Sequence, residues 1–143
     1  QILCGGGALR PEGLEGGYYV LPTVLGSVPF GSTGWTDEIF GPVICVRSFE
    51  TEEEAIALTN ESVYGLGHAV MSADMERCER VAAQLDAGSV WINCNQALFP
   101  QTPFGGWKQS GFGKEYGEAG LQEYLRHKTV TTAQHGYSWG YYG

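Results

Sequence analysis

Short apolar runs alternate with helix-like segments through the middle of the chain. Residues 43–49 form a nearly continuous apolar run, typical of a strand covered on both faces. Residues 67–71 and 89–94 form two further runs, so the predicted strands begin at an even spacing, near residues 43, 66 and 89. This spacing is typical of β-α-β-α-β units with parallel strands. We therefore predict an α/β fold with an open, mostly parallel sheet and flanking helices.

The segments between these strands carry helix start signals. Thr51 and Glu54 stand in capping-box positions for a helix that ends near residue 59. Asp74 is the predicted N-cap of a second helix, which Gly88 would end. The apolar positions of this second helix fall on one face: Met75, Cys78, Val81, Ala82 and Leu85.

The N-terminal part of the chain is less regular. Residues 1–17 begin with an apolar run and become loop, and residues 18–25 have strand composition. Pro22 cannot donate to a ladder, so that strand is expected at an edge or a bulge. Residues 26–37 are predicted to be irregular.

The C-terminal part ends in a predicted strand and an aromatic tail. A short helix is expected over residues 118–125, with Leu121, Tyr124 and Leu125 as its buried stripe. Residues 127–132 show β-branched alternation, which predicts a strand. The tail aromatics predict an interface: Tyr137, Trp139, Tyr141 and Tyr142.

Composition narrows the range of partners. The 143 residues carry 8 Lys and Arg against 16 Asp and Glu, and the net charge of −8 disfavours nucleic acid and anionic membranes. We see neither a secretory leader nor an apolar run long enough to span a bilayer. The first residue is Gln1, not Met, and we expect these residues to be part of something larger.

The cysteines are widely spaced and include no Cys-x-x-Cys pair: Cys4, Cys45, Cys78 and Cys94. This spacing favours buried, reduced thiols over a disulfide framework or a zinc site. A reducing compartment follows, and we predict a cytoplasmic location, with organellar targeting left open.

The most distinctive stretch is residues 103–120. Its glycines stand among four aromatic residues, Phe104, Trp107, Phe112 and Tyr116. A flexible linker would lack such rings, so the mixture predicts an ordered loop that faces a ligand.

This stretch resembles the C-terminal signature of the aldehyde dehydrogenase superfamily, in the form Pro103-Phe-Gly-Gly-x-Lys-x-Ser-Gly-x-Gly-x-Glu-x-Gly117. Further motifs similar to that family lie upstream in the expected order: Glu38-Ile-Phe-Gly-Pro42, Asn60-x-x-x-Tyr64-Gly-Leu66 and Gly88-x-Val-Trp-Ile-Asn93. The resemblance runs from about residue 10 to residue 132 and covers only the last third of such proteins. It implies that residues 1–125 are the C-terminal portion of the catalytic domain and residues 126–143 an oligomerisation strand with an aromatic tail.

The resemblance implies oxidation of a small-molecule aldehyde by NAD, with NADP also possible, in a homo-dimer or homo-tetramer. In this family a cysteine thiolate attacks the aldehyde, hydride passes to the cofactor, and a glutamate base assists hydrolysis. The nucleophile and the base belong to motifs that precede these residues, and no Gly-x-Gly-x-x-Gly fingerprint occurs here. Residues 1–143 alone are therefore predicted to be inactive. Two alternatives are a non-catalytic module that pairs with a full-length subunit and, less favoured, a bare nucleotide-binding module.

The resemblance also implies roles for particular side chains. Glu38 would accept hydrogen bonds from the nicotinamide ribose hydroxyls, and Phe40 would lie against the nicotinamide ring. Phe104 would face the substrate tunnel, with Phe99 and Leu98 as weaker candidates. The local residues alone favour a different interpretation. Glu38 would be a solvated charge, and the three phenylalanines would be ordinary core residues.

The substrate class is suggested by residues 93–106 and 138–142, which look similar to betaine-aldehyde and aminoaldehyde dehydrogenases. Aromatic side chains could hold an ammonium group by cation–π attraction. Many plant members carry Trp in place of Phe104 and Cys in place of Leu98. They also often end in a peroxisomal address, whereas these residues end in Tyr-Tyr-Gly. Ser89 is small enough to leave room for a trimethylammonium group. Catalytic residues and metal ligands are predicted to be absent from these residues.

Two minor predictions concern polar side chains. Asn93 is expected to satisfy backbone groups at a strand end. Lys108, Glu115 and Glu118 are expected to be structural hydrogen-bonding groups of the glycine-rich loop, as we call residues 103–120. His68, His127 and His135 show no ligand spacing and receive no role.

Overall fold

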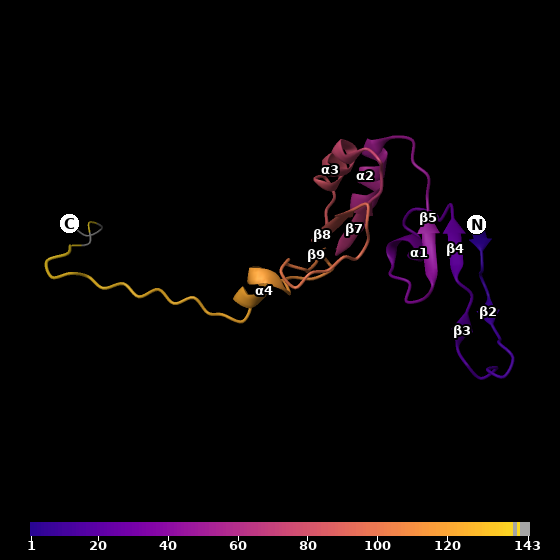
Figure 1. The fold of residues 1–143 in the computed structure, drawn as a ribbon, viewed down its shortest axis with the longest axis horizontal. Helices are drawn as coiled ribbons and strands as arrows, with labels where there is room; N and C mark the ends of the chain where they lie inside the picture. The colour runs from indigo at the N-terminus through magenta and orange to yellow at the C-terminus, as the bar shows by residue number, and fades with distance from the viewer. Residues whose placement is uncertain (139, 141–143) are drawn as a thin grey trace.

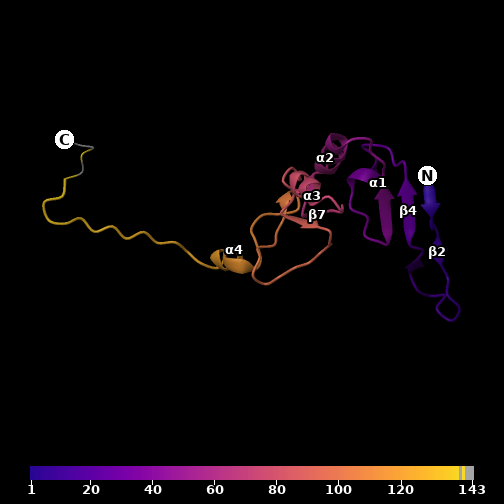
Figure 2. The same cartoon turned by 45° about the horizontal axis from the view of Figure 1, so that its top comes forward.

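The computed structural model describes residues 1–138 and residue 140. Two groups of strands lie on either side of the connection that leads into helix α2 (Glu52–Asn60), and an extended C-terminal arm points away from both (Figure 1). The second view preserves this arrangement (Figure 2). Of the predicted aromatic tail, Trp139, Tyr141 and Tyr142 lie outside the described residues, and Tyr137 is exposed.

The N-terminal group is a three-stranded sheet of order β1-β4-β5. Strand β1 (Ile2–Cys4) pairs antiparallel with β4 (Thr23–Gly26), which pairs in parallel with β5 (Val43–Val46). A separate hairpin joins β2 (Ala8–Leu9) to β3 (Tyr19–Val20). The predicted strand over residues 18–25 is thus split at Leu21 and Pro22, as a proline inside a strand favours.

The second group is a βαβ unit. Strand β7 (Gly67–Val70) pairs in parallel with β8 (Ser89–Ile92), and helix α3 (Met75–Ala82) connects the two. This confirms the predicted parallel unit. Helix α3 ends at Ala82, so the prediction that Gly88 ends it is wrong.

Both predicted helix caps are present. The Thr51 hydroxyl accepts a hydrogen bond from the Glu54 N–H at 3.2 Å, and the Asp74 carboxylate accepts one from the Arg77 N–H at 3.0 Å. The second half of the capping box differs from the prediction. The Glu54 carboxylate accepts from the Glu50 N–H at 2.8 Å, one residue before the N-cap.

The prediction of one sheet containing all three central strands is wrong. Strand β5 pairs with β4, and β7 pairs with β8, in separate sheets. An even spacing along the sequence indicates that strands and helices alternate, but it does not determine which strand edges meet. The region from 26 to 37, predicted to be irregular, contains a short helix α1 (Thr33–Thr36).

A small antiparallel pair joins β6 (Tyr64–Gly65), just before β7, to β9 (Trp107–Lys108) in the C-terminal third. Helix α4 (Gly117–Gln122) begins at the end of the glycine-rich loop, close to its predicted position. The prediction of a buried apolar stripe on this helix is wrong, because Leu121, Tyr124 and Leu125 are all exposed. Residues 127–132 form no ladder within the described part of the chain and run through the exposed arm.

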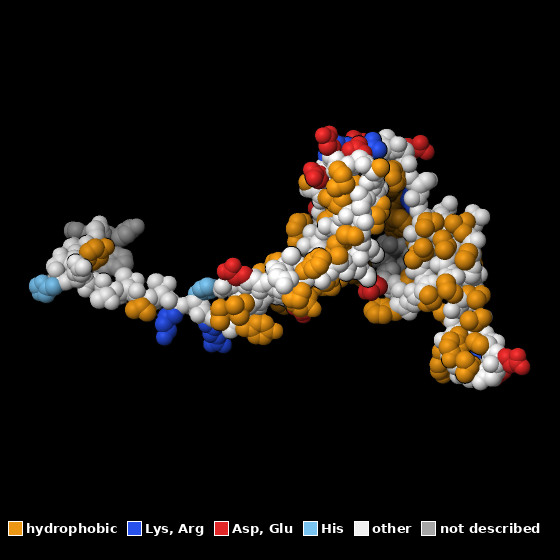
Figure 3. Space-filling model, viewed as in Figure 1, with side chains coloured by type: hydrophobic (Ala, Val, Ile, Leu, Met, Phe, Trp, Pro, Cys, Tyr) orange, Lys and Arg blue, Asp and Glu red, His pale blue; other side chains and the backbone are white. Residues whose placement is uncertain are grey.

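The core is small for a chain with so many apolar residues. Among the described residues, the buried hydrophobic positions are Cys78, Leu85 and Ala87. In contrast, Ile44 on β5 is 59% exposed, so the prediction that this strand is covered on both faces fails for this chain. Hydrophobic side chains are visible over much of the surface in the space-filling view (Figure 3).

The four cysteines are free, as predicted. Only Cys78 is fully buried, whereas Cys4 and Cys94 are exposed, so the predicted burial is confirmed for one thiol. The described residues contain no cluster of metal-ligating side chains and no helix that could cross a membrane.

Candidate functional site

The glycine-rich loop is ordered by backbone contacts. Phe104 and Glu115 exchange two backbone hydrogen bonds, at 2.8 and 2.7 Å. The start of β8 abuts this loop so closely that a Cβ on Gly88 would overlap the Gly105 carbonyl oxygen. These contacts confirm that the loop is ordered. They also explain why Gly88 is a glycine, because the two backbones lie too close together for a Cβ atom.

One lysine side chain holds the loop to its surroundings and another holds the loop to itself. The Lys108 ammonium donates to the carbonyl oxygens of Asn60 at 2.7 Å and Ser62 at 3.2 Å, and pairs with the Asp86 carboxylate at 3.1 Å. The Lys114 ammonium donates to the Gly106 carbonyl at 3.1 Å. The structural role predicted for Lys108 is therefore confirmed.

Two neighbouring hollows lie beside this loop and share Leu66 and Ser110. One, of about 340 Å³, is lined by Phe104 and the loop itself. The other, of about 310 Å³, is lined by Glu38 together with Trp35, Ser62, Tyr64 and His68. The fold therefore brings Glu38 and Phe104 to adjacent hollows, although they are far apart in the sequence. Ser110 anchors the boundary, because its hydroxyl accepts a hydrogen bond from the Gly65 N–H at 3.0 Å.

The other predicted site residues lie outside both hollows. Phe40 is 94% exposed, so the alternative that it is ordinary core is wrong for this chain. Leu98 and Phe99 are also exposed. Ser89 begins β8, and its backbone N–H donates to the Leu66 carbonyl oxygen at 3.1 Å. Only Glu38 and Phe104 are thus brought into neighbouring positions.

Asn93 has the structural role that the sequence predicted. Its side-chain oxygen accepts from the Ser72 N–H, and its side-chain nitrogen donates to the Ser72 carbonyl, both at 2.9 Å. Its backbone has a positive φ of 54°, a conformation that asparagine tolerates better than most residues. The side chain therefore fixes the turn at the end of β8 to the end of β7.

His68, to which the sequence assigned no role, has an unusual environment. It lies on β7 and lines the hollow that contains Glu38. Its Nε2 atom is buried and has no hydrogen-bond partner among the described residues. Burial, helped by the positive charge of Lys108, lowers the pKa of the imidazole.

Glu38 and Phe40 are the residues of the described chain whose chemistry could serve one side of a nicotinamide nucleotide. Both side chains belong to the segment that enters β5, and both are exposed. A free carboxylate can accept hydrogen bonds from ribose hydroxyls, and an uncovered aromatic ring can lie against a flat heterocycle. These two side chains could therefore form part of a cofactor site.

Comparison with known proteins identifies the family. The model of the aldehyde dehydrogenase family matches residues 1–130. The chain belongs to this family, which confirms the resemblance seen in the sequence motifs.

Two enzymes of this family are similar to the chain over nearly its whole length. The chain is 51% identical over 141 residues to the chloroplastic betaine aldehyde dehydrogenase of Atriplex hortensis, covering 99% of this chain and 28% of that protein. It is 52% identical over 141 residues to the peroxisomal aminoaldehyde dehydrogenase 2 of Pisum sativum, with the same coverage. The chain thus spans little more than a quarter of the length of these relatives.

A solved structure shares the fold. A betaine aldehyde dehydrogenase double mutant from Staphylococcus aureus, in complex with NAD+, matches with a TM-score of 0.92 and 42% identity. This match covers 100% of the chain and 29% of the solved one. An aldehyde dehydrogenase from Mycobacterium tuberculosis, also complexed with NAD+, matches with a TM-score of 0.85 at 40% identity, over 97% and 28% of the two chains.

Proposed function

We propose that these residues act as the C-terminal part of an NAD(P)+-dependent aldehyde dehydrogenase that converts betaine aldehyde or an aminoaldehyde to the carboxylic acid. The observation that carries the proposal is sequence identity. About half of all positions, over nearly the whole chain, are identical to those of betaine aldehyde and aminoaldehyde dehydrogenases. The match to NAD+ complexes of the same family supports NAD as the cofactor.

Within that enzyme, the chain helps to bind and orient the cofactor and the aldehyde. Glu38 is proposed to hold the nicotinamide ribose and Phe40 to limit the position of the nicotinamide ring. When bound, the cofactor would supply the hydride acceptor for the oxidation. Holding the reacting groups in a fixed relation can lower a barrier by several kcal/mol, so these two residues act on rate as well as on affinity.

The substrate side of the proposal rests on the glycine-rich loop. Phe104 lines the hollow next to the one that contains Glu38. An aromatic ring in that position can attract an ammonium group on the substrate, by roughly 0.5 to 2 kcal/mol. Phe99, Leu98 and Ser89 are proposed to lie further from the reacting carbon and to shape the space around that group.

The test begins with the intact native polypeptide that contains residues 88–93. Its mass is measured, and NAD+ and NADP+ reduction is then followed with betaine aldehyde, a primary aminoaldehyde and an uncharged aldehyde of similar size. A mass well above the 15.5 kDa of these residues, with faster turnover of the charged aldehydes, supports the proposal. Absence of aldehyde-dependent cofactor reduction contradicts it. A mass equal to that of residues 1–143 would favour the non-catalytic pairing module.

A further inference from the structure

The segment between β8 and β9 carries two neighbouring apolar side chains that are exposed. Leu98 is 46% exposed and Phe99 is 57% exposed. Both lie between the end of β8 at Ile92 and the start of β9 at Trp107. Side chains on a loop can select a substrate only if the backbone that carries them is held in place. The contacts of residues 97–100 therefore decide what this pair can do.

The backbone on the C-terminal side of the pair is held by the chain that follows it. The Phe99 carbonyl oxygen accepts hydrogen bonds from the backbone N–H and the hydroxyl of Thr102, at 3.0 and 3.1 Å. The Pro100 carbonyl oxygen accepts one at 2.9 Å from the N–H of Gly117, the first residue of α4. These contacts fix one end of the exposed pair.

On the N-terminal side, the anchor is a side chain of β8. The Trp91 indole N–H donates to the Ala97 carbonyl oxygen at 2.8 Å, and this bond is partly buried. The ring is confined as well, because a Cβ on Gly67 of β7 would lie 2.5 Å from one of its carbon atoms. A ring packed so closely on the neighbouring strand cannot swing away from the loop. Trp91 therefore ties the β7–β8 sheet to the residue directly before Leu98.

The segment that this bond holds is strained. Gln96, directly before Ala97, has a positive φ of 55°. This conformation costs free energy for residues other than glycine, and asparagine tolerates it better than glutamine. A strained backbone persists only where the surrounding contacts enforce it. The bond from Trp91 to the next residue is such a contact, so its loss should let Gln96 relax and move Leu98.

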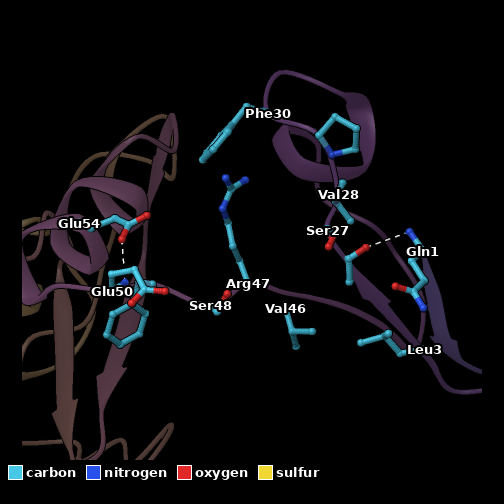
Figure 4. Close-up of a pocket in the computed structure, with 13 residues that line it drawn as sticks. Gln1, Leu3, Ser27, Val28, Phe30, Val46, Arg47, Ser48, Glu50 and Glu54 are labelled. Atoms are coloured by element: carbon cyan, nitrogen blue, oxygen red, sulfur yellow. Dashed lines mark hydrogen bonds between the residues drawn. The ribbon is translucent and has the colours of Figure 1, made fainter.

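The large hollow at the carboxyl ends of β4 and β5 has no part in this arrangement. Its volume is about 810 Å³, and the residues that line it all lie between Gln1 and Glu54 in the sequence. Figure 4 shows Arg47 extending into it toward Phe30, with the guanidinium 3.7 Å from the centre of the ring. None of its lining residues belongs to residues 93–106, so this hollow offers no alternative anchor for the loop.

We propose that Trp91 is a positioning residue for substrate choice, which acts through the Ala97 carbonyl to set where Leu98 and Phe99 stand against the bulky end of the aldehyde. The inference rests on the proposed function, in which these two side chains shape the space around the ammonium group. Trp91 itself does not contact the aldehyde in this account. The simpler alternative is that its ring only packs on β7, in which case the indole N–H contributes nothing to substrate choice.

Trp91→Phe in the full-length enzyme separates the two accounts, because it keeps an aromatic ring and removes the N–H donor. The substrates are propanal and whichever of betaine aldehyde and a primary aminoaldehyde is turned over faster. We expect kcat/KM for the charged aldehyde to fall roughly 3- to 10-fold, about the worth of one hydrogen bond, and that for propanal to change less than about twofold. The loss should appear mainly in KM, since binding is weakened and the reacting groups are unchanged. Equal falls for both aldehydes, or no fall, would overturn the proposal.

Gln96→Asn tests the route through the strained residue. Asparagine adopts a positive φ more readily, so a loop with asparagine at this position depends less on the bond from Trp91. The double variant of Trp91→Phe with Gln96→Asn should recover part of the lost selectivity, and Gln96→Asn alone should leave the selectivity close to that of the natural protein. A double variant that is no more selective than Trp91→Phe would contradict the proposed route from Trp91 to Leu98.

A structural readout keeps this inference apart from the proposed function. A trifluoromethyl-phenylalanine label is placed at position 99 or, as the control, at position 104, where the Phe104 backbone is held by its own two hydrogen bonds to Glu115. Trp91→Phe should shift or broaden the fluorine resonance of the label at position 99 and leave the one at position 104 unchanged. An unchanged resonance at position 99 would overturn the proposal even in an active enzyme. If the resonance changes as expected but the natural protein oxidises no aldehyde, the proposed function fails and the anchor stands.

Discussion

At the residue scale, Asn93 combines two features that other side chains cannot replace together. Alanine in its place loses both hydrogen bonds to Ser72 and is forced into the left-handed region. We expect Asn93→Ala to lower the free energy of unfolding of the intact protein by about 2 to 4 kcal/mol, from two hydrogen bonds and the cost of positive φ. Asn93→Gly loses the hydrogen bonds only and should cost less. Chemical denaturation measures both, and equal losses would show that the backbone conformation contributes nothing.

Ser89 gives a prediction about substrate choice. If its small side chain leaves room for a trimethylammonium group, Ser89→Ile in the full enzyme raises the Michaelis constant for betaine aldehyde and changes that for an uncharged aldehyde little. A bulky group added to a tight pocket weakens binding of the larger substrate by about 1 to 3 kcal/mol, which is roughly 10- to 200-fold. Steady-state kinetics with the two substrates tests this. An unchanged constant for betaine aldehyde would remove Ser89 from the list of specificity residues.

At the element scale, the close contact between β8 and the glycine-rich loop depends on Gly88. A Cβ there would meet the Gly105 carbonyl, and neither backbone can move without disturbing a ladder or the loop. We expect Gly88→Ala to destabilise the intact protein by about 1 to 3 kcal/mol or more, as overpacking does. Gly16 has nothing within 4 Å of its Cβ position, so Gly16→Ala is the matched control. Comparable unfolding midpoints for the two variants would refute this account of the contact.

Helices α2 and α3 are joined by charge as well as by packing. The Glu52 carboxylate receives two hydrogen bonds from the Arg80 guanidinium, at 2.8 and 2.9 Å, and lies 3.4 Å from Arg77. The hydrogen bonds from Arg80 lower the pKa of Glu52. A carboxylate with a lowered folded-state pKa stabilises the fold fully above its ordinary pKa of about 4.3 and loses that contribution as the pH falls further.

We therefore expect Glu52→Gln to lower the midpoint of thermal unfolding at neutral pH. The difference from the natural protein should shrink in about 1 M salt, where exposed charges are screened, and should vanish as the pH falls through the lowered pKa. Glu53→Gln, on the same helix turn, is the control. A difference that persists at low pH would mean that Glu52 acts through packing instead of charge.

At the scale of the whole molecule, the sequence predicted the elements better than their assembly. The caps at Thr51 and Asp74 and the parallel β7–β8 unit follow from local patterns, which is why they were predictable. The pairing of β5 with β4 depends on long-range contacts that no local pattern records. The motifs singled out Glu38 and Phe104, which line neighbouring hollows, but their roles stay predictions. A single histidine in a strand has no motif, so His68 received no role.

Exposed apolar side chains are best understood at this scale too. The sequence pattern of residues 43–49 predicted a strand covered on both faces, yet Ile44 and Val46 are uncovered in this chain. Apolar residues normally occupy such positions only when something packs on them. The apolar pattern thus fits a strand that is covered in the longer protein that we propose, whereas the structure shows residues 1–143 by themselves.

The extended arm supplies the last prediction. Residues 127–132 have strand composition, form no ladder within the described chain and carry Val130 at 79% exposure. A strand of this kind can complete a sheet in a neighbouring subunit through main-chain hydrogen bonds.

Deleting residues 126–143 from the full-length protein should therefore yield monomers or insoluble material. Val130→Pro is the sharper variant, because it keeps the length and removes one ladder donor. Val130→Thr keeps that donor and the β-branched shape, so it should assemble normally. Light scattering after size-exclusion chromatography measures the mass of each species, and an assembly of unchanged mass after the deletion would mean that subunits meet through another surface.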